Sequence, residues 1–134
     1  MANLGVNVTQ KTARAVERAA GATLTAANVM MAVKTADGLL YQATDASGLT
    51  SVVGILADLN RANTTGVAVA VPGWFWMANA TVNPCSAATI QSACYVSGTD
   101  GFTVAASGTS NSVKAGTVRD FDATNNFVLV DIGN

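Results

Sequence analysis

The run Gly66–Met77, GVAVAVPGWFWM, constrains the possible folds more than any other part of the sequence. Valines alternate with alanines in its first half, which is the two-residue period of a half-buried β-strand. Pro72 and Gly73 then interrupt the run. Proline lacks the backbone donor and glycine allows unusual dihedral angles, so the pair predicts a bulge, a bend or a strand edge. We therefore expect this run to be the central strand of an all-β domain.

The interruption decides which way the two tryptophans of the chain point. If no residue is inserted there, Phe75 and Met77 continue the valine face into the core. Trp74 and Trp76 then lie on the opposite face, with the alanines, where a flat protein partner can approach closely. A one-residue bulge would reverse the assignment. We expect the first arrangement, which makes the tryptophans candidate interface residues.

The composition limits the kind of protein this can be. The chain has 134 residues, enough for one domain with a sizeable core. Charged residues make up 11% of it, about half of the usual share. Such a surface is typical of a protein packed against others, or of a β-protein rich in small residues. The net charge is −1 with no basic stripe, which disfavours binding to nucleic acid.

We expect neither a secretory signal nor a membrane span. The first twenty residues lack the apolar region of a signal peptide. The longest apolar stretch is the Gly66–Met77 run, which is far too short to cross a bilayer.

Residues 1–20 are expected to form an N-terminal arm that precedes a β-domain of residues 21–134. Two structures are open for Thr9–Ala20: a short helix capped by Thr9 and ended by Gly21, or an extended segment. We favour an extended or irregular segment, because the rest of the chain has a β pattern.

The arm carries most of the cationic charge, at Lys11, Arg14 and Arg18. These side chains either form a solvated face or contact an acidic surface of a partner.

From Gly21 onward, turn signals recur every eight to twelve residues, the spacing of a sandwich or barrel. Asp37-Gly38 and Gly98–Gly101 each separate two apolar runs, as in β-hairpins. Residues 122–125 separate the last two runs, and residues 87–93 are ambiguous. We expect a small β-barrel or sandwich of about eight to nine short strands. Besides the Gly66–Met77 run, they lie at residues 29–34, 39–44, 52–56, 94–97, 102–105, 113–121 and 127–132.

Residues suited to catalysis are few. The chain has no histidine, which removes the commonest general base and metal ligand. Asp120 and Asp122 are spaced to share a strand face, but two carboxylates offer too few oxygens for a calcium site. Cys85 and Cys94 are interpreted as partly buried free thiols, and a disulfide between them stays open. We expect no enzyme activity, no cofactor and no metal.

The C-terminal half contains, in this order, the segments Tyr95-Val96, Phe102–Val104, Val113–Val118 and Val128–Ile132. This order resembles the tail of the small capsid decoration, or cement, proteins of bacteriophages, which typically has a YV hairpin, a VKVG-V strand and an apolar strand that ends in V-I. Upstream, Ala20–Thr44, Val53–Ile55 and Val67–Gly73 are similar to the opening and the centre of the family pattern, so the resemblance covers Gly21–Gly133. The aromatic WFWM segment and the longer arm depart from it.

The resemblance implies a non-enzymatic viral structural protein on the surface of the virion, assembled in the host cytoplasm. Its partner would be the major capsid protein, and it would be a homo-oligomer, either a trimer or a dimer. The alternative reading from the residues is a small β-sandwich binding module, possibly for carbohydrate, with Trp74 and Trp76 stacking on sugar rings.

Overall fold

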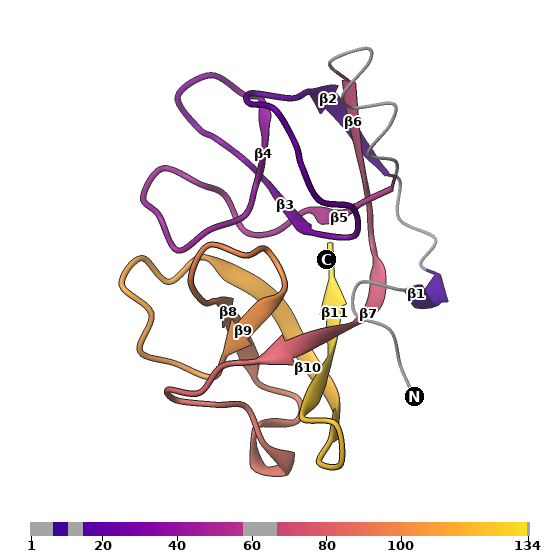
Figure 1. Ribbon diagram of the computed structural model, residues 1–134, viewed down its shortest axis with the longest axis vertical. Helices are drawn as coiled ribbons and strands as arrows, with labels where there is room; N and C mark the ends of the chain where they lie inside the picture. Colours follow the sequence, from indigo (N-terminus) through magenta and orange to yellow (C-terminus); the bar gives the residue numbers. More distant parts are fainter. Residues whose placement is uncertain (1–6, 11–14, 58–66, 134) are drawn as a thin grey trace.

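The protein is all-β, with two sheets stacked along the long axis of the molecule (Figure 1). The computed structural model describes residues 7–10, 15–57 and 67–133. Within them the structure has eleven strands, one 3₁₀ turn and no α-helix. The expected all-β class is therefore confirmed, with more strands than the expected eight to nine.

The upper sheet in Figure 1 has five strands, in the order β2-β6-β5-β3-β4. An isolated bridge between Ala20 and Leu40 links its two ends. Its strands are β2 (Val16–Ala19), β3 (Met30–Val33), β4 (Leu40–Gln42), β5 (Gly54–Leu56) and β6 (Val67–Val71).

The lower sheet closes on itself, because β9 pairs with β7 as well as with β8. The five strands β7, β11, β10, β8 and β9 form this barrel, and β1 (Asn7–Gln10) pairs with the first half of β7 outside it. The barrel strands are β7 (Gly73–Asn79), β8 (Ala93–Val96), β9 (Thr103–Ala105), β10 (Lys114–Asp122) and β11 (Phe127–Ile132).

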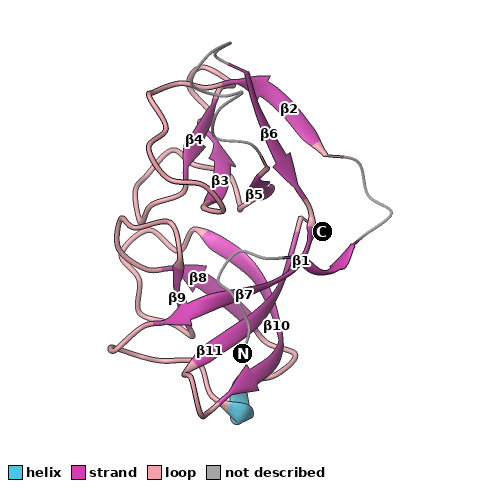
Figure 2. Ribbon diagram, turned by 45° about the vertical axis from the view of Figure 1, so that its right-hand side comes forward, coloured by secondary structure: helices cyan, strands magenta, loops and turns pink. Residues whose placement is uncertain are grey.

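The three expected hairpins are present. β3 pairs with β4, β8 with β9 and β10 with β11, all antiparallel. The ambiguous residues 87–93 contain the 3₁₀ turn η1 (Ala87–Thr89), drawn in cyan in Figure 2. Ser86 and Thr89 cap this turn reciprocally, the arrangement of a capping box.

The N-terminal segment does not form the alternative helix in its described parts. β1 lies against β7, and β2 pairs with β6 from Val16↔Ala70 to Ala19↔Val67. The arm therefore runs antiparallel to the continuous stretch that contains β6 and β7. Residues 11–14 lie outside the described residues.

The expected single central strand is wrong in one respect: it is two strands in different sheets, β6 and β7 (Figure 1). Before Pro72 the alanines are buried and the valines half-buried; after it, Phe75 and Met77 are buried and the tryptophans half-buried. Without a phase change, the tryptophans would lie on the same face as the alanines. This expectation is wrong, because the alanines are buried and the tryptophans are not. The phase changes at Pro72-Gly73 because the chain passes from one hydrophobic core to the other.

Two cores result, and β3 separates them. Met30 and Ala32 belong to the barrel core, and Met31 packs in the upper core together with Val33. β5 is divided in the same way, with Ile55 in the barrel core and Leu56 in the upper core. Strands that are buried on both faces read as continuous apolar runs, as the sequence VMMAV does.

β5 also lies unusually close to β6. A Cβ atom added at Gly54 would lie 2.7 Å from the backbone of Ala70 and Val71. Only glycine fits there, which explains the glycine within the apolar run VVGIL.

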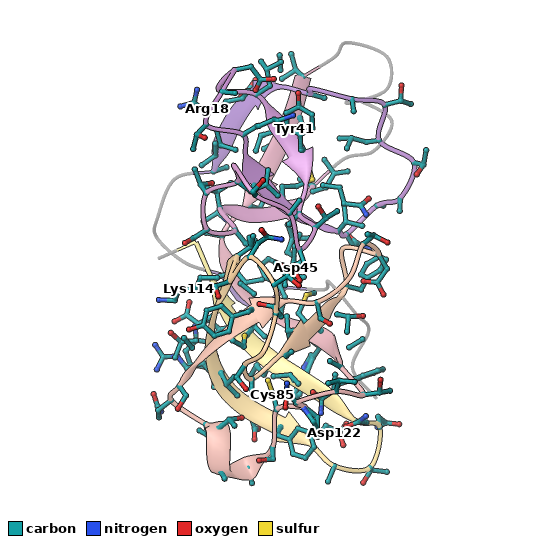
Figure 3. All side chains as sticks on the ribbon, turned by 90° about the vertical axis from the view of Figure 1, so that its left-hand side faces the viewer. Arg18, Tyr41, Asp45, Cys85, Lys114 and Asp122 are labelled. Carbon is teal, nitrogen blue, oxygen red and sulfur yellow. The ribbon has the colours of Figure 1, made fainter. Side chains whose placement is uncertain are left out.

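Polar contacts tie the upper sheet to the barrel loops. The carboxylate of Asp45, at the middle of the molecule in Figure 3, accepts hydrogen bonds from the backbone N–H groups of Ser110 and Asn111, both at 2.8 Å. The Gln42 amide donates to the carbonyl of Thr99 at 2.8 Å. The two halves are therefore joined both by the shared strand and at the surface.

We expect Met30→Ala and Met31→Ala each to lower the free energy of unfolding by about 2–5 kcal/mol, because each removes a fully buried side chain from a different core. Since β3 serves both cores, calorimetry should show a single transition for both variants. Val82→Ala is the control: this side chain is 72% exposed, and stability should change by less than about 0.5 kcal/mol. Two separate transitions in either methionine variant would contradict the shared core.

Candidate interaction face

Trp74 and Trp76 lie on the outer face of the barrel. They alternate along β7 with Phe75 and Met77, which pack in the barrel core, so they project to the other side of the sheet. Both tryptophans are half-buried. This position agrees with the expectation from the sequence that the tryptophans point away from the core. The alanines expected on the same face are instead buried in the upper core.

The neighbouring strand adds an unusual pair to this face. Trp76 lies opposite Leu129 and Trp74 opposite Asp131 in the β7–β11 register. Both β11 side chains are buried, although they alternate with the core residues Val128 and Val130. Asp131 is the one buried charged side chain among the described residues, 4% exposed.

Arg119 of β10 joins Asp131 to Trp74. Its Nη2 and Nε atoms donate to Oδ2 of Asp131 at 2.9 and 3.2 Å. Its guanidinium carbon lies 5.7 Å from the ring centroid of Trp74, within the range of a cation–π interaction. Its Nη1 donates to Oε1 of Gln91 at 2.6 Å. We call Trp74, Trp76, Arg119, Leu129 and Asp131 the aromatic face.

This face is held in one arrangement before any partner binds. The three hydrogen bonds and the ring contact fix the Arg119 guanidinium, which otherwise has many rotamers. A flat aromatic surface with a fixed cation suits the binding of another protein surface.

Arg18, the one expected basic residue that the structure describes, belongs to the upper sheet and not to the barrel strands of this face. Arg18 lies in β2 of the upper sheet, at the opposite end of the molecule from Cys85 and Asp122 (Figure 3), and donates to the carbonyl of Gly38 at 3.3 Å. Lys11 and Arg14, the other candidate interface cations, lie outside the described residues.

The aspartates before glycine support turns, as the sequence predicts. Asp37 accepts from the Tyr41 hydroxyl at 2.6 Å and from the Leu39 N–H at 3.0 Å. These bonds, that of Tyr41 foremost, lower the pKa of Asp37, and the pKa of Tyr41 is raised because it donates to the carboxylate. Asp100 accepts from the N–H groups of Phe102 and Thr103.

The two aspartates considered for a cation do not converge on one. Asp122 is occupied by the turn that follows it: its carboxylate accepts from the side chain and N–H of Asn125 and from the N–H of Thr124. The side-chain amide of Asn125, followed by its backbone N–H, lowers the pKa of Asp122. Within the described residues, no three acidic, histidine or cysteine side chains come close enough to hold a metal ion.

An open pocket of about 440 Å³ lies beside the end of β7 and the β8–β9 turn. Asn79, Asp100 and Thr103 line it, and each of these side chains is already hydrogen-bonded within the protein. These three side chains are therefore already used within the protein.

Sequence reasoning missed Arg119 and Asp131 as part of the aromatic face. A signal for Asp131 exists in the sequence: it is the one charged residue in the apolar run FVLVDI. A charge in a buried strand needs a partner, but only the structure identifies that partner as Arg119, which lies at the register shift of the neighbouring strand β10.

Comparison of the chain with protein-family models, with curated proteins and with solved structures gives no significant match to any of them. Over the part of the chain that the structure describes, no helix has the length and hydropathy needed to span a membrane.

We expect Asp131→Asn to lower the free energy of unfolding by about 2–4 kcal/mol. The substitution leaves Arg119 without its anionic partner in a partly buried site, and the Arg119 side chain is 28% exposed, which moderates the loss. The intrinsic tryptophan fluorescence should change as well, because the guanidinium over Trp74 loses its anchor. Asp120→Asn on the neighbouring strand β10 is the matched control, since Asp120 is exposed. Equal stability of the two variants in urea unfolding would contradict this assignment.

Proposed function

We propose that the protein is a non-enzymatic structural protein of a phage virion, which binds the outer surface of the capsid and stabilises the head. The resemblance of Gly21–Gly133 to capsid decoration proteins is one support. The observation that carries the proposal is the aromatic face, where two tryptophans lie two residues apart beside a fixed arginine. Tryptophan and arginine are the residues most enriched at binding hot spots.

The chemistry of the described side chains also favours association over catalysis. Asp37, Asp45, Asp100 and Asp122 are all engaged in turns or loops, and Asp131 is paired with Arg119. The first four carboxylates accept hydrogen bonds from backbone N–H groups and the fifth accepts from a guanidinium, so their printed contacts serve the fold.

The stabilising mechanism would be mass action. A protein that binds only the assembled lattice stabilises it by RT ln(1 + [L]/Kd). If the bound form is a homo-oligomer, a trimer or a dimer, contacts with several major capsid proteins raise the effective concentration and strengthen the binding. The low charge of the chain suits a surface that stays packed against others.

The rival function, a carbohydrate-binding module that uses Trp74 and Trp76, requires free indole faces for sugar stacking. The Arg119 guanidinium lies over the ring of Trp74, so a sugar would have to displace an arginine that is held by three hydrogen bonds. This contact favours the protein partner over the sugar.

Capsids that lack the protein should release their DNA at a lower temperature than complete capsids, and addition of the purified protein should restore the higher temperature. The physical reason is the preferential binding to the intact lattice. Dye-monitored melting of the particles measures the release. Equal release temperatures with and without the protein would remove the capsid proposal.

Trp76→Ala should weaken the binding to capsids by about 2 kcal/mol or more, the size of a hot-spot loss. The isolated protein should stay folded, because Trp76 is only half-buried. Co-sedimentation of the variant with stripped capsids over a concentration series gives the change in Kd.

Tyr95→Ala is the matched control for Trp76→Ala. Tyr95 is also a half-buried aromatic residue on the outer side of the barrel, but it lies on β8, which does not pair with β7. Its removal should leave capsid binding unchanged. A loss of binding in Tyr95→Ala but not in Trp76→Ala would place the contact on another face. Binding of Trp76→Ala equal to that of the native protein, together with loss of binding to a glycan array, would favour the carbohydrate module.

A further inference from the structure

Arg119 lies at an irregularity of the barrel. In the pairing of β10 with β11, Val118 lies opposite Val130 and Asp120 opposite Leu129, so Arg119 is an extra residue between two pairs. An extra residue of this kind is a β-bulge, which bends the strand and redirects a side chain. The side chain of this extra residue is the one that reaches across the aromatic face.

The segment after the 3₁₀ turn η1 holds this bulge in place. The N–H of Gln91 donates to the carbonyl of Val118 at 2.7 Å, and the N–H of Val118 donates to the carbonyl of Ser92 at 2.9 Å. Ile90, just before, packs against the barrel core, and Cys94, which follows, is a free thiol buried within that core. Gln91 therefore lies in a segment that is anchored on both sides.

Gln91 has a backbone conformation that glutamine seldom adopts. Its φ is +77°, in the left-handed region that glycine and asparagine favour and that strains most other residues. The residue is exposed, so packing of its side chain in the core does not explain the glutamine. What the glutamine provides is its amide oxygen, which accepts from Nη1 of Arg119 at 2.6 Å.

The bond to Gln91 restrains a motion that Asp131 alone would allow. Both hydrogen bonds from Arg119 to Asp131 end on one oxygen atom, Oδ2, at 2.9 and 3.2 Å. Two bonds to a single atom lack the fixed geometry of a fork between two oxygens, so the guanidinium can pivot about that atom. The bond from the other terminal nitrogen to Gln91 opposes the pivot and keeps the guanidinium over the ring of Trp74.

We propose that Gln91 is a positioning residue of the aromatic face: it holds the Arg119 guanidinium over Trp74 in the arrangement that a protein partner binds. The inference rests on the proposed function, in which that partner is the capsid surface. An arginine that is already ordered loses less conformational entropy on binding than a mobile one. Loss of the Gln91 amide therefore weakens binding even where the fold is intact.

Gln91→Gly separates positioning from stability. Glycine adopts a positive φ without strain, which offsets the greater freedom that it gives the unfolded chain. The melting temperature should therefore stay within about 3 °C of the native value. The dissociation constant for stripped capsids, measured by co-sedimentation, should rise about tenfold, as for loss of one hydrogen bond to a charged group.

Gln91→Glu and Asn28→Gly are the matched controls. Glutamate keeps an oxygen acceptor and the same backbone conformation, so capsid binding should stay within about twofold of the native value. Asn28 also has a positive φ, 62°, and is exposed in the segment before β3 of the upper sheet. Its replacement by glycine should leave binding unchanged. Native binding by Gln91→Gly, or an equal loss of binding in Asn28→Gly, overturns the proposal.

A measurement on the protein alone distinguishes failure of this proposal from failure of the proposed function. Nuclear magnetic resonance of isotope-labelled protein follows the exchange with solvent of the Arg119 Nε–H, which donates to Asp131. Exchange should be faster in Gln91→Gly than in the native protein and in Gln91→Glu, because the guanidinium is less restrained. Equal exchange in all three overturns the role of Gln91. Faster exchange in Gln91→Gly, combined with no capsid binding by the native protein, supports the role of Gln91 and rejects the capsid as the partner.

Discussion

The structure depends on one strand that has no solvent-facing side. β3 lies between the barrel core and the upper core and contributes alternate side chains to each. The neighbouring strand β5 is divided between the same two cores. Gly54 in turn allows β5 to approach β6 closely. The chain must also pass from one core to the other, and Pro72-Gly73 provides the crossing. A short protein thereby buries two clusters of apolar residues that share the same strands.

The features that the sequence predicts well are local. Asp37-Gly38 and Asp100-Gly101 identify hairpins because aspartate accepts from the next backbone N–H groups and glycine adopts a positive φ, 72° and 78° here. Alternating apolar residues locate nearly every strand after Gly21 within a few residues of its observed bounds. These signals depend on neighbours in the chain, so the sequence contains them in full.

The features that the sequence does not predict are distant pairings. The parallel pairing of β9 with β7 closes the barrel, and no residue in either strand indicates it. The sequence favours an arrangement without a phase change at Pro72-Gly73, because the run looks like a single strand, whereas two sheets meet there in the structure. The sequence predicts only part of the aromatic face. The alternation along β7 predicts that the two tryptophans share a face. Arg119 and Asp131 join them only because β10, β11 and β7 pair side by side.

The aromatic face shows what a low content of charged residues allows. The chain has few ionised groups, and among the described residues Arg119 is held by Asp131, Gln91 and Trp74 at once. A side chain already ordered in this way loses little conformational entropy on binding, so a partner gains most of the contact energy. The barrel has a comparable fixed point at Cys85, whose backbone is held by two hydrogen bonds with the Asn79 side chain. On the proposed function, a protein that must hold a capsid lattice benefits from both, because a stiff binding surface on a stiff barrel transmits load without first yielding itself.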